Sequence, residues 1–213
     1  MKPRSMFRAP GPRTRRLAAF LKRRARSAPE RRPTLDCQAF STLFRKRAVV
    51  FTDTADFTVR TAADGILHFL MLFERAVRAA APKIAAAGGD IVKVEGDSLL
   101  IRFPDVRAAC RGVDALQACL QRINRANPKD ERLAFSYGIG YGDVLDLEDD
   151  LFGLEVNLAS KLGEDMALPG EALLTPAAAA SLDRLTLKRI VPYRVVTFGT
   201  RAIPIQRLKL RPR

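Results

Sequence analysis

The sequence has few of the features that mark membrane-spanning, disulfide-bonded or histidine-dependent proteins. It has no run of about 18 apolar residues, and its most apolar segment, 65–73, is about half the length that crosses a bilayer. The three cysteines, Cys37, Cys110 and Cys119, lack the even number and close spacing of a disulfide framework or zinc site. The only histidine, His68, lies in the apolar segment, where a packed imidazole is commoner than a catalytic one. We therefore expect a cytoplasmic protein with free thiols, at most peripheral to a membrane.

Acidic residues are scarce near the N-terminus, and this concentrates the net charge of +14 there. Residues 1–34 hold 12 Lys or Arg against one acid, Glu30, so they contribute +11, and the remaining 179 residues contribute +3. This composition predicts a basic tail over 1–34 that is disordered or forms a short amphipathic helix over 13–26. Such a tail suits an anionic membrane surface or an acidic partner. The nearly neutral remainder, 35–213, predicts a single domain that does not bind nucleic acid.

From residue 45 onward, the hydrophobic period alternates between strand and helix spacing. This pattern predicts strands over 48–53, 91–94, 98–103, 133–142 and 173–175, and helices over 61–87, 105–126 and 156–162. The first six of these elements follow the order βαββαβ. We therefore expect an α+β fold with a ferredoxin-like core and additional strands and helices.

Two aspartates are the first candidates for chemistry. Asp53 ends the first predicted strand, and Asp97 lies in the turn of the predicted hairpin. If those strands are neighbours, the two carboxylates meet at one edge of the sheet. Paired carboxylates without a thiol or imidazole suit Mg²⁺ or Mn²⁺, which keep a substrate phosphate among their ligands. The residues alone leave an alternative open, because aspartates in turns commonly serve local hydrogen bonding.

Four segments resemble motifs of the class III adenylyl and guanylyl cyclases, and the resemblance covers nearly all of residues 46–210. Segment 51–58 (FTDTADFT) is similar to the first metal motif of the family, and segment 88–97 (GGDIVKVEGD) to its Gly-Gly to Lys-x-x-Gly-Asp motif. Segments 150–153 (DLFG) and 156–162 (VNLASKL) resemble the Asp-x-Phe-Gly and Val-Asn-x-Ala-x-Arg-Leu elements.

The resemblance implies the class III nucleotidyl cyclase fold and an enzyme of the adenylate cyclase type, a phosphorus-oxygen lyase in signal transduction. Such an enzyme closes a nucleoside triphosphate into a 3′,5′-cyclic monophosphate and releases pyrophosphate. The implied cofactors are two Mg²⁺ or Mn²⁺ ions, with Asp53 and Asp97 as metal ligands. The ions would lower the pKa of the ribose 3′-hydroxyl and neutralise the triphosphate.

Four further positions carry the roles of substrate recognition in the family. Lys93 and Asp150 match the base-reading pair, and Asn157 matches the residue that orients the ribose. Lys161 stands where the family has its transition-state Arg, and it keeps the charge without the planar fork that binds two phosphate oxygens. A carboxylate acceptor and an ammonium donor match the amino group and N1 of adenine and oppose guanine, so we expect ATP as the substrate.

The family shares its catalytic site across a head-to-tail homodimer, and this chain carries both sets of residues. The resemblance therefore implies a homodimer with two equivalent sites. Because Lys161 departs from the family, a weak or inactive domain that senses a nucleotide or acts as a dimerisation scaffold remains an alternative. A pyrimidine-specific cyclase is another. An RNA-recognition motif is disfavoured, because hairpin residues such as Val94 and Ile101 supply no stacking aromatics.

Overall fold

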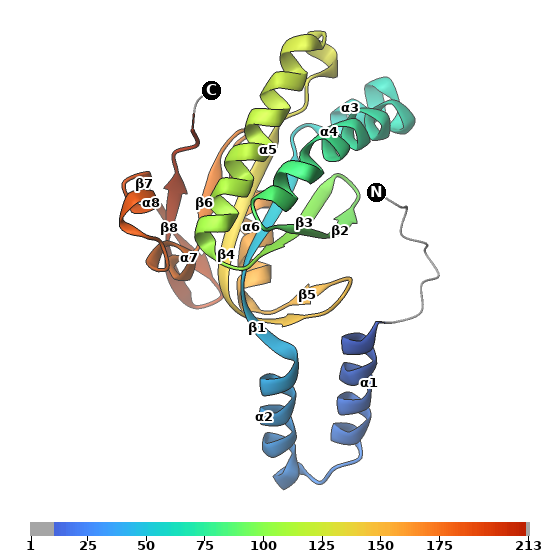
Figure 1. The fold of residues 1–213 in the computed structure, drawn as a ribbon, viewed down its shortest axis with the longest axis vertical. Coiled ribbons are helices and arrows are strands. Elements are labelled where there is room, and N and C mark those ends of the chain that lie inside the picture. Colours follow the sequence, from blue (N-terminus) through green and yellow to red (C-terminus); the bar gives the residue numbers. More distant parts are fainter. Residues whose placement is uncertain (1–10, 212–213) are drawn as a thin grey trace.

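The computed structural model describes residues 11–211 and shows a mixed β-sheet with helices on both faces (Figure 1). Two N-terminal helices, α1 (Pro12–Ala25) and α2 (Arg32–Leu43), form a hairpin that projects from one end of the sheet. A short 3₁₀ turn, η1 (Pro29–Arg31), lies between them. Among these described residues, no helix is long and apolar enough to cross a membrane.

The core follows the order βαββαβ, with its first helix divided in two. Its elements are β1 (Phe44–Thr54), α3 (Phe57–Asp64), α4 (Ile66–Ala86), β2 (Asp90–Glu95), β3 (Ser98–Phe103), α5 (Val106–Ala126) and β4 (Phe135–Asp146), with the 3₁₀ turn η2 (Lys129–Glu131) before β4. The elements that follow are β5 (Leu151–Phe152), α6 (Leu154–Asp165), β6 (Ala172–Leu174), α7 (Pro176–Ala180), α8 (Arg184–Leu187), β7 (Ile190–Phe198) and β8 (Arg201–Leu208).

The sheet has the strand order β2-β3-β1-β4-β6-β8-β7, and β5 pairs with β4 outside this path. The first four strands of this order form the ferredoxin-like core, in which β1 lies between its antiparallel neighbours β3 and β4. The predicted α+β fold is therefore confirmed.

Alternation along β1 divides the core between the two faces of the sheet. Ala48 and Val50 pack into the large cluster under α4 and α5, whereas Val49 and Phe51 pack into a smaller cluster under α6. Successive side chains of a strand point to opposite faces, so Asp53 lies on the α6 face together with Val49 and Phe51.

The structure differs from the predicted elements in several places. The expected helix over 61–87 is two helices, because Gly65 between them has a φ of 83°, which lies outside the helical region. The strand predicted over 133–142 continues to Asp146 as β4. The C-terminal hairpin of β7 and β8 was not predicted.

The N-terminal segment forms structure next to the predicted tail boundary. Residues Pro12–Ala25 are helical, as in one of the two alternatives for the basic tail. Helix α2 includes residue 34, where we placed the end of the tail. The boundary between tail and domain stays a prediction. The part of the tail before residue 11 lies outside the described residues.

Candidate functional site

The structure places Asp53 and Asp97 at one edge of the sheet. Antiparallel pairing of Thr52 with Leu99 puts the end of β1 beside the turn between β2 and β3. The Thr54 hydroxyl donates a hydrogen bond to the backbone oxygen of Asp97 at 2.8 Å, and the Ser98 hydroxyl donates to the Asp53 carboxylate at 3.4 Å. The β1–β3 register therefore brings together two aspartates that are far apart in the sequence.

Burial disfavours the ionised forms of both carboxylates, and the charge of Asp97 further disfavours that of Asp53. Partial burial and then the charge of Asp97 raise the pKa of Asp53 to about 6. Burial also raises the pKa of Asp97. Within residues 11–211, no ion pair neutralises either carboxylate. A cation bound between them would relieve this repulsion.

The chemistry of this pair fits a hard divalent cation. Both donors are carboxylate oxygens, which Mg²⁺ and Mn²⁺ prefer. The described chain contains no cluster of three or more His, Cys, Asp or Glu side chains arranged to hold a metal ion. Any ion held by Asp53 and Asp97 would therefore need further oxygen ligands, such as substrate phosphates or water.

The base-reading candidates Lys93 and Asp150 lie in contact. Lys93 on β2 and Asp150 just before β5 form an ion pair with a nitrogen–oxygen distance of 3.4 Å. Lys93 also pairs with Glu95 at 2.9 Å, and these hydrogen bonds and charges together raise the pKa of Lys93 despite partial burial. The Asp150 carboxylate is oriented by the backbone N–H of Leu151, which donates to it at 2.9 Å. A donor and an acceptor therefore lie side by side.

A cavity lies beside this pair. It has a volume of about 610 Å³ and is lined by residues of α4 and β2, with Lys93, Gly89 and Asp149 in its wall. Cavities of several hundred Å³ are typical of small-ligand sites. The cavity therefore offers room for a nucleobase next to Lys93.

The other two candidates, Asn157 and Lys161, lie apart from both pairs. They are four residues apart on α6, so they share one exposed face of the helix. The Lys161 ammonium forms an ion pair with Asp165 one turn further along. Within residues 11–211, no hydrogen bond or ion pair joins either side chain to the carboxylates or to the base-reading pair. Their face of α6 is free to meet a substrate or a second chain.

Sequence and structure comparisons identify the relatives of this chain. The "Putative adenylate cyclase 3" of Rhizobium meliloti is 28% identical over 126 residues, which are 59% of this chain and 21% of the relative. The "Adenylate cyclase" of Streptomyces coelicolor is 30% identical over 136 residues, which are 64% of this chain and 34% of the relative. The crystal structure named "Adenylate/Guanylate Cyclase/Hydrolase" from Silicibacter pomeroyi matches with a TM-score of 0.64 and 29% identity, covering 78% of this chain and 96% of that one.

The chain belongs to the class III adenylyl/guanylyl cyclase catalytic domains. No protein-family model matches it. This cyclase domain spans about a fifth and about a third of the lengths of the two curated relatives.

Glycines that the sequence analysis did not single out set the position of α6 in this cyclase domain. A Cβ on Gly138 would lie 1.9 Å from the backbone oxygen of Ala159, and one on Gly140 would lie 2.3 Å from that of Glu155. Helix α6 can therefore pack directly on the backbone of β4, which fixes the helix that carries Asn157. The signal in the sequence was glycine at every second position over 138–142.

The sequence analysis also missed Asp146, which is buried at the end of β4. It bonds to arginines from three different elements of the cyclase domain. Because these partners are distant in the sequence, no local pattern indicates this cluster. It lies next to the loop that carries Asp150.

Proposed function

We propose that this cyclase domain converts ATP to 3′,5′-cyclic AMP and pyrophosphate. The ribose 3′-oxygen attacks the α-phosphorus, the bond from that phosphorus to the pyrophosphate oxygen breaks, and the hydroxyl proton leaves to solvent. The observation that supports this best is the contact between Lys93 and Asp150 next to a cavity of nucleobase size. Both curated relatives are named as adenylate cyclases.

The choice of ATP follows from the hydrogen-bonding groups of the base-reading pair. The Asp150 carboxylate would accept a hydrogen bond from the amino group of adenine, and Lys93 would donate to N1. Guanine presents a carbonyl oxygen and an N1 donor at the same positions, so it would face each group with the wrong partner. Unpaired polar groups in a partly dehydrated pocket cost about 1–3 kcal/mol each, enough for strong discrimination.

Asp53 and Asp97 would hold two Mg²⁺ or Mn²⁺ ions together with the triphosphate. When bound, such ions lower the pKa of the ribose hydroxyl and neutralise the departing pyrophosphate. The carboxylates themselves would determine where the cations, and with them the triphosphate, are held at the edge of the sheet. Their raised pKa values fit this role, because a carboxylate that lacks a cationic partner gains most from a bound cation.

Asn157 and Lys161 would complete the site of a second chain in a head-to-tail homodimer. An apolar groove on α4 and β2 supports an interface, since it is lined by Leu67, Leu70, Met71 and Val94. Leu67 is 80% exposed in the single chain. Contiguous exposed apolar side chains of this kind mark interaction surfaces. In such a dimer, Asn157 would orient the ribose and Lys161 would neutralise charge on the reacting phosphate.

The test of this proposal is to incubate the purified chain with Mn²⁺ and each of ATP, GTP, CTP and UTP, and to separate the products by chromatography. We expect cyclic AMP as the main product, and none from the Asp53→Ala variant. This variant should melt at no lower a temperature, because Asp53 is not part of the core and its ionised form is disfavoured in the folded chain. Turnover of GTP or of a pyrimidine nucleotide with ATP ignored would refute the assignment of ATP.

One observation favours a second candidate, a domain that binds a nucleotide with little or no turnover. Lys161 replaces the arginine of the family, and its ammonium is paired with Asp165 on the same helix. A Lys161→Arg variant restores a guanidinium that can bind two phosphate oxygens, so we expect it to raise kcat several-fold if the domain is a weak cyclase. Nucleotide binding without product from either protein would establish the second candidate.

A further inference from the structure

The position of Asp150 depends on a short loop between two paired strands. The loop comprises residues 147–150, because Asp146 at the end of β4 pairs with Leu151 at the start of β5. The backbone N–H of Leu147 donates to the backbone oxygen of Asp150 at 3.0 Å and closes the turn. A contact made by the middle of this loop therefore lies within two residues of Asp150 and constrains its position.

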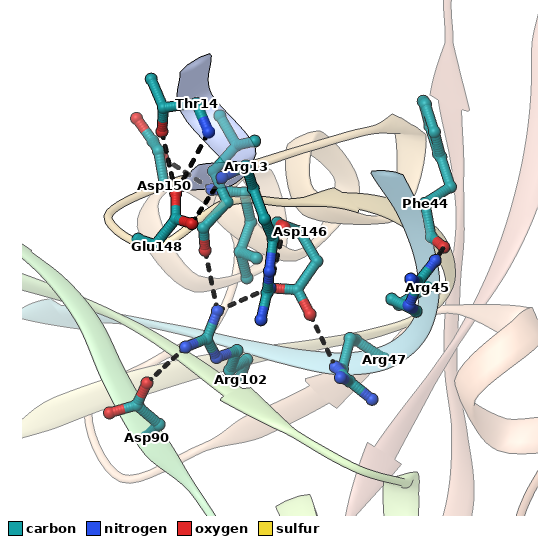
Figure 2. A network of polar contacts seen from close by, with 12 residues as sticks. Arg13, Thr14, Phe44, Arg45, Arg47, Asp90, Arg102, Asp146, Glu148 and Asp150 are labelled. Carbon is teal, nitrogen blue, oxygen red and sulfur yellow. Dashed lines mark hydrogen bonds and ion pairs between the residues drawn. The ribbon is translucent and has the colours of Figure 1, made fainter. Parts of the chain in front are cut away.

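The base of the loop is fixed by a buried carboxylate. The Asp146 side chain is 1% exposed and accepts hydrogen bonds from Arg102 at 2.5 Å and from Arg47 at 2.9 Å. It also forms an ion pair with Arg13 at 2.9 Å, and the Arg13 guanidinium donates to the Asp146 backbone oxygen at 2.9 Å. Figure 2 shows these arginines converging on Asp146 from β3, β1 and α1. Arg102 also donates to the backbone oxygen of Leu147 at 2.8 Å. Charge-assisted hydrogen bonds to a buried carboxylate are strong and directional, so they hold the base of the loop in place.

The tip of the loop is held by the first turn of α1. The Glu148 carboxylate accepts from the backbone N–H groups of Arg13 at 2.6 Å and Thr14 at 3.2 Å, and from the Thr14 hydroxyl at 3.1 Å (Figure 2). These N–H groups have no partner within the helix, and the helix dipole favours a negative charge at this end. Gly11 lies directly against the same carboxylate, because a Cβ on Gly11 would be 2.3 Å from Cδ of Glu148.

The contact between α1 and the loop depends on an ionised Glu148 carboxylate. Burial acts to raise the pKa of Glu148, but the backbone hydrogen bonds of Arg13 and Thr14 outweigh it and lower the pKa to about 2. Glu148 is therefore a carboxylate throughout the neutral range and holds α1 there. Arg13 binds both ends of the loop, through its backbone to Glu148 and through its guanidinium to Asp146.

We propose that Arg13, Thr14 and Glu148 are positioning residues for base selection: docking of α1 on the loop holds the Asp150 carboxylate beside Lys93. This inference rests on the proposed role of Lys93 and Asp150 in reading adenine. A loop held at its base and its tip has few alternative conformations, so Asp150 is already oriented when the nucleotide arrives. Releasing Glu148 frees Asp150 to turn away, which removes discrimination between bases and leaves the phosphate and metal contacts intact.

The test compares the binding of two non-cyclising nucleotides to the full chain. The Kd values of α,β-methylene-ATP and α,β-methylene-GTP are measured with Mn²⁺ by calorimetry for the unsubstituted protein and for Glu148→Ala. We expect the preference for the ATP analogue to fall about tenfold in the variant, because small misplacements of a recognition group are costly. Arg16→Ala is the matched control, since Arg16 is an exposed arginine of the same helix. Its preference should not change.

A conservative variant separates positioning from a merely structural role. Glu148→Gln keeps one acceptor oxygen for the N–H groups of α1, so its preference should lie between those of the unsubstituted protein and Glu148→Ala. An equal loss of affinity for both analogues, or an unchanged ratio in Glu148→Ala, would overturn the inference. Failure to form cyclic AMP would defeat the proposed activity, whereas the ratio of analogue affinities would still report whether α1 positions Asp150.

Discussion

At the scale of single residues, the surroundings of Asp53 give an ordinary side chain an unusual ionisation. Burial opposes the ionisation of both Asp53 and Asp97, and the charge of Asp97 also opposes that of Asp53. Glu148 shows the opposite case, in which hydrogen bonds from the backbone of α1 favour the charged form. The same side-chain chemistry thus gives a proposed cation site in one place and a carboxylate bound to the first turn of α1 in the other.

The raised pKa of Asp53 predicts pH-dependent metal binding. Mn²⁺ requires the ionised carboxylate, and the pKa is about 6, so we expect Mn²⁺ affinity to fall about tenfold between pH 7 and pH 5. Loss of the electron paramagnetic resonance signal of free Mn²⁺ measures the binding. Asp143→Asn, which alters an exposed aspartate on β4, should keep this profile, whereas Asp53→Asn should abolish most of the binding.

The free energy of unfolding of the metal-free protein should change with pH in the opposite direction to the Mn²⁺ affinity, so it should fall as the pH rises. The folded-state pKa of Asp53 lies above its ordinary value of 3.8, so protonation favours the folded state. This contribution is fully present below about pH 3.8 and is lost as the pH rises through about 6.

A profile of Mn²⁺ binding that is flat between pH 5 and pH 7 would contradict the assignment of Asp53 as a ligand with a raised pKa.

At the scale of elements, the packing of α6 on β4 determines where Asn157 and Lys161 lie. The backbones of the two elements approach closely at Gly138 and Gly140, where no side chain would fit. On the other face of the sheet, Asp105 caps α5 by accepting from the N–H of Ala108 at 2.7 Å. Both features leave a local mark in the sequence, glycine at every second position over 138–142 and an aspartate before a helix, but the sequence analysis did not single them out.

Gly138→Ala should therefore displace α6. The new methyl group would overlap the backbone oxygen of Ala159, which cannot rotate away, so we expect a loss of about 1–3 kcal/mol in the free energy of unfolding. Cyclic AMP formation should fall further than stability alone explains, because Asn157 and Lys161 move with the helix. Urea unfolding and initial rates measure the two effects.

Gly199→Ala provides the comparison for this variant. Gly199 has a φ of 58° in the turn between β7 and β8, and a Cβ there would meet nothing within 4 Å. It should cost about 1 kcal/mol through backbone strain and leave kcat unchanged. If Gly138→Ala matched the activity of Gly199→Ala, close packing of α6 would be unimportant for the site.

At the scale of the whole molecule, the candidate functional residues fall into separate groups. Asp53 and Asp97 lie together, and so do Lys93 and Asp150, whereas Lys161 and its neighbours on α6 face outward. The exposed apolar groove of α4 and β2 offers a surface for a second chain. A closed homodimer would bring the groups of one chain against those of the other.

This arrangement predicts complementation between two inactive variants. Asp53→Ala removes a metal ligand and Asn157→Ala removes the ribose contact, so a mixed dimer retains one site in which both groups are intact. Random mixing should restore about a quarter of the unsubstituted activity, since half of the dimers are mixed and each has one of two sites. No recovery, with mixed dimers demonstrated by differently tagged chains, would place the complete site within one chain.

Much of this protein follows from its sequence, because periodicity, glycines and capping residues act over short distances. They determine the order βαββαβ, and the cyclase motifs single out Asp53, Lys93 and Asp97 by their spacing. The division of the long helix at Gly65 was not predicted. Backbone conformation at one residue leaves little trace in a periodic pattern.

The tertiary structure alone decided which of these residues meet. The β1–β3 register joins Asp53 to the turn of Asp97, and the path of the chain returns α1 to Glu148, 135 positions from Arg13. Contacts over such separations depend on the packing of the whole sheet, which no short segment encodes. The basic segment therefore reads as a solvated tail in the sequence, whereas in the folded chain its first turn is bound to the loop that carries Asp150.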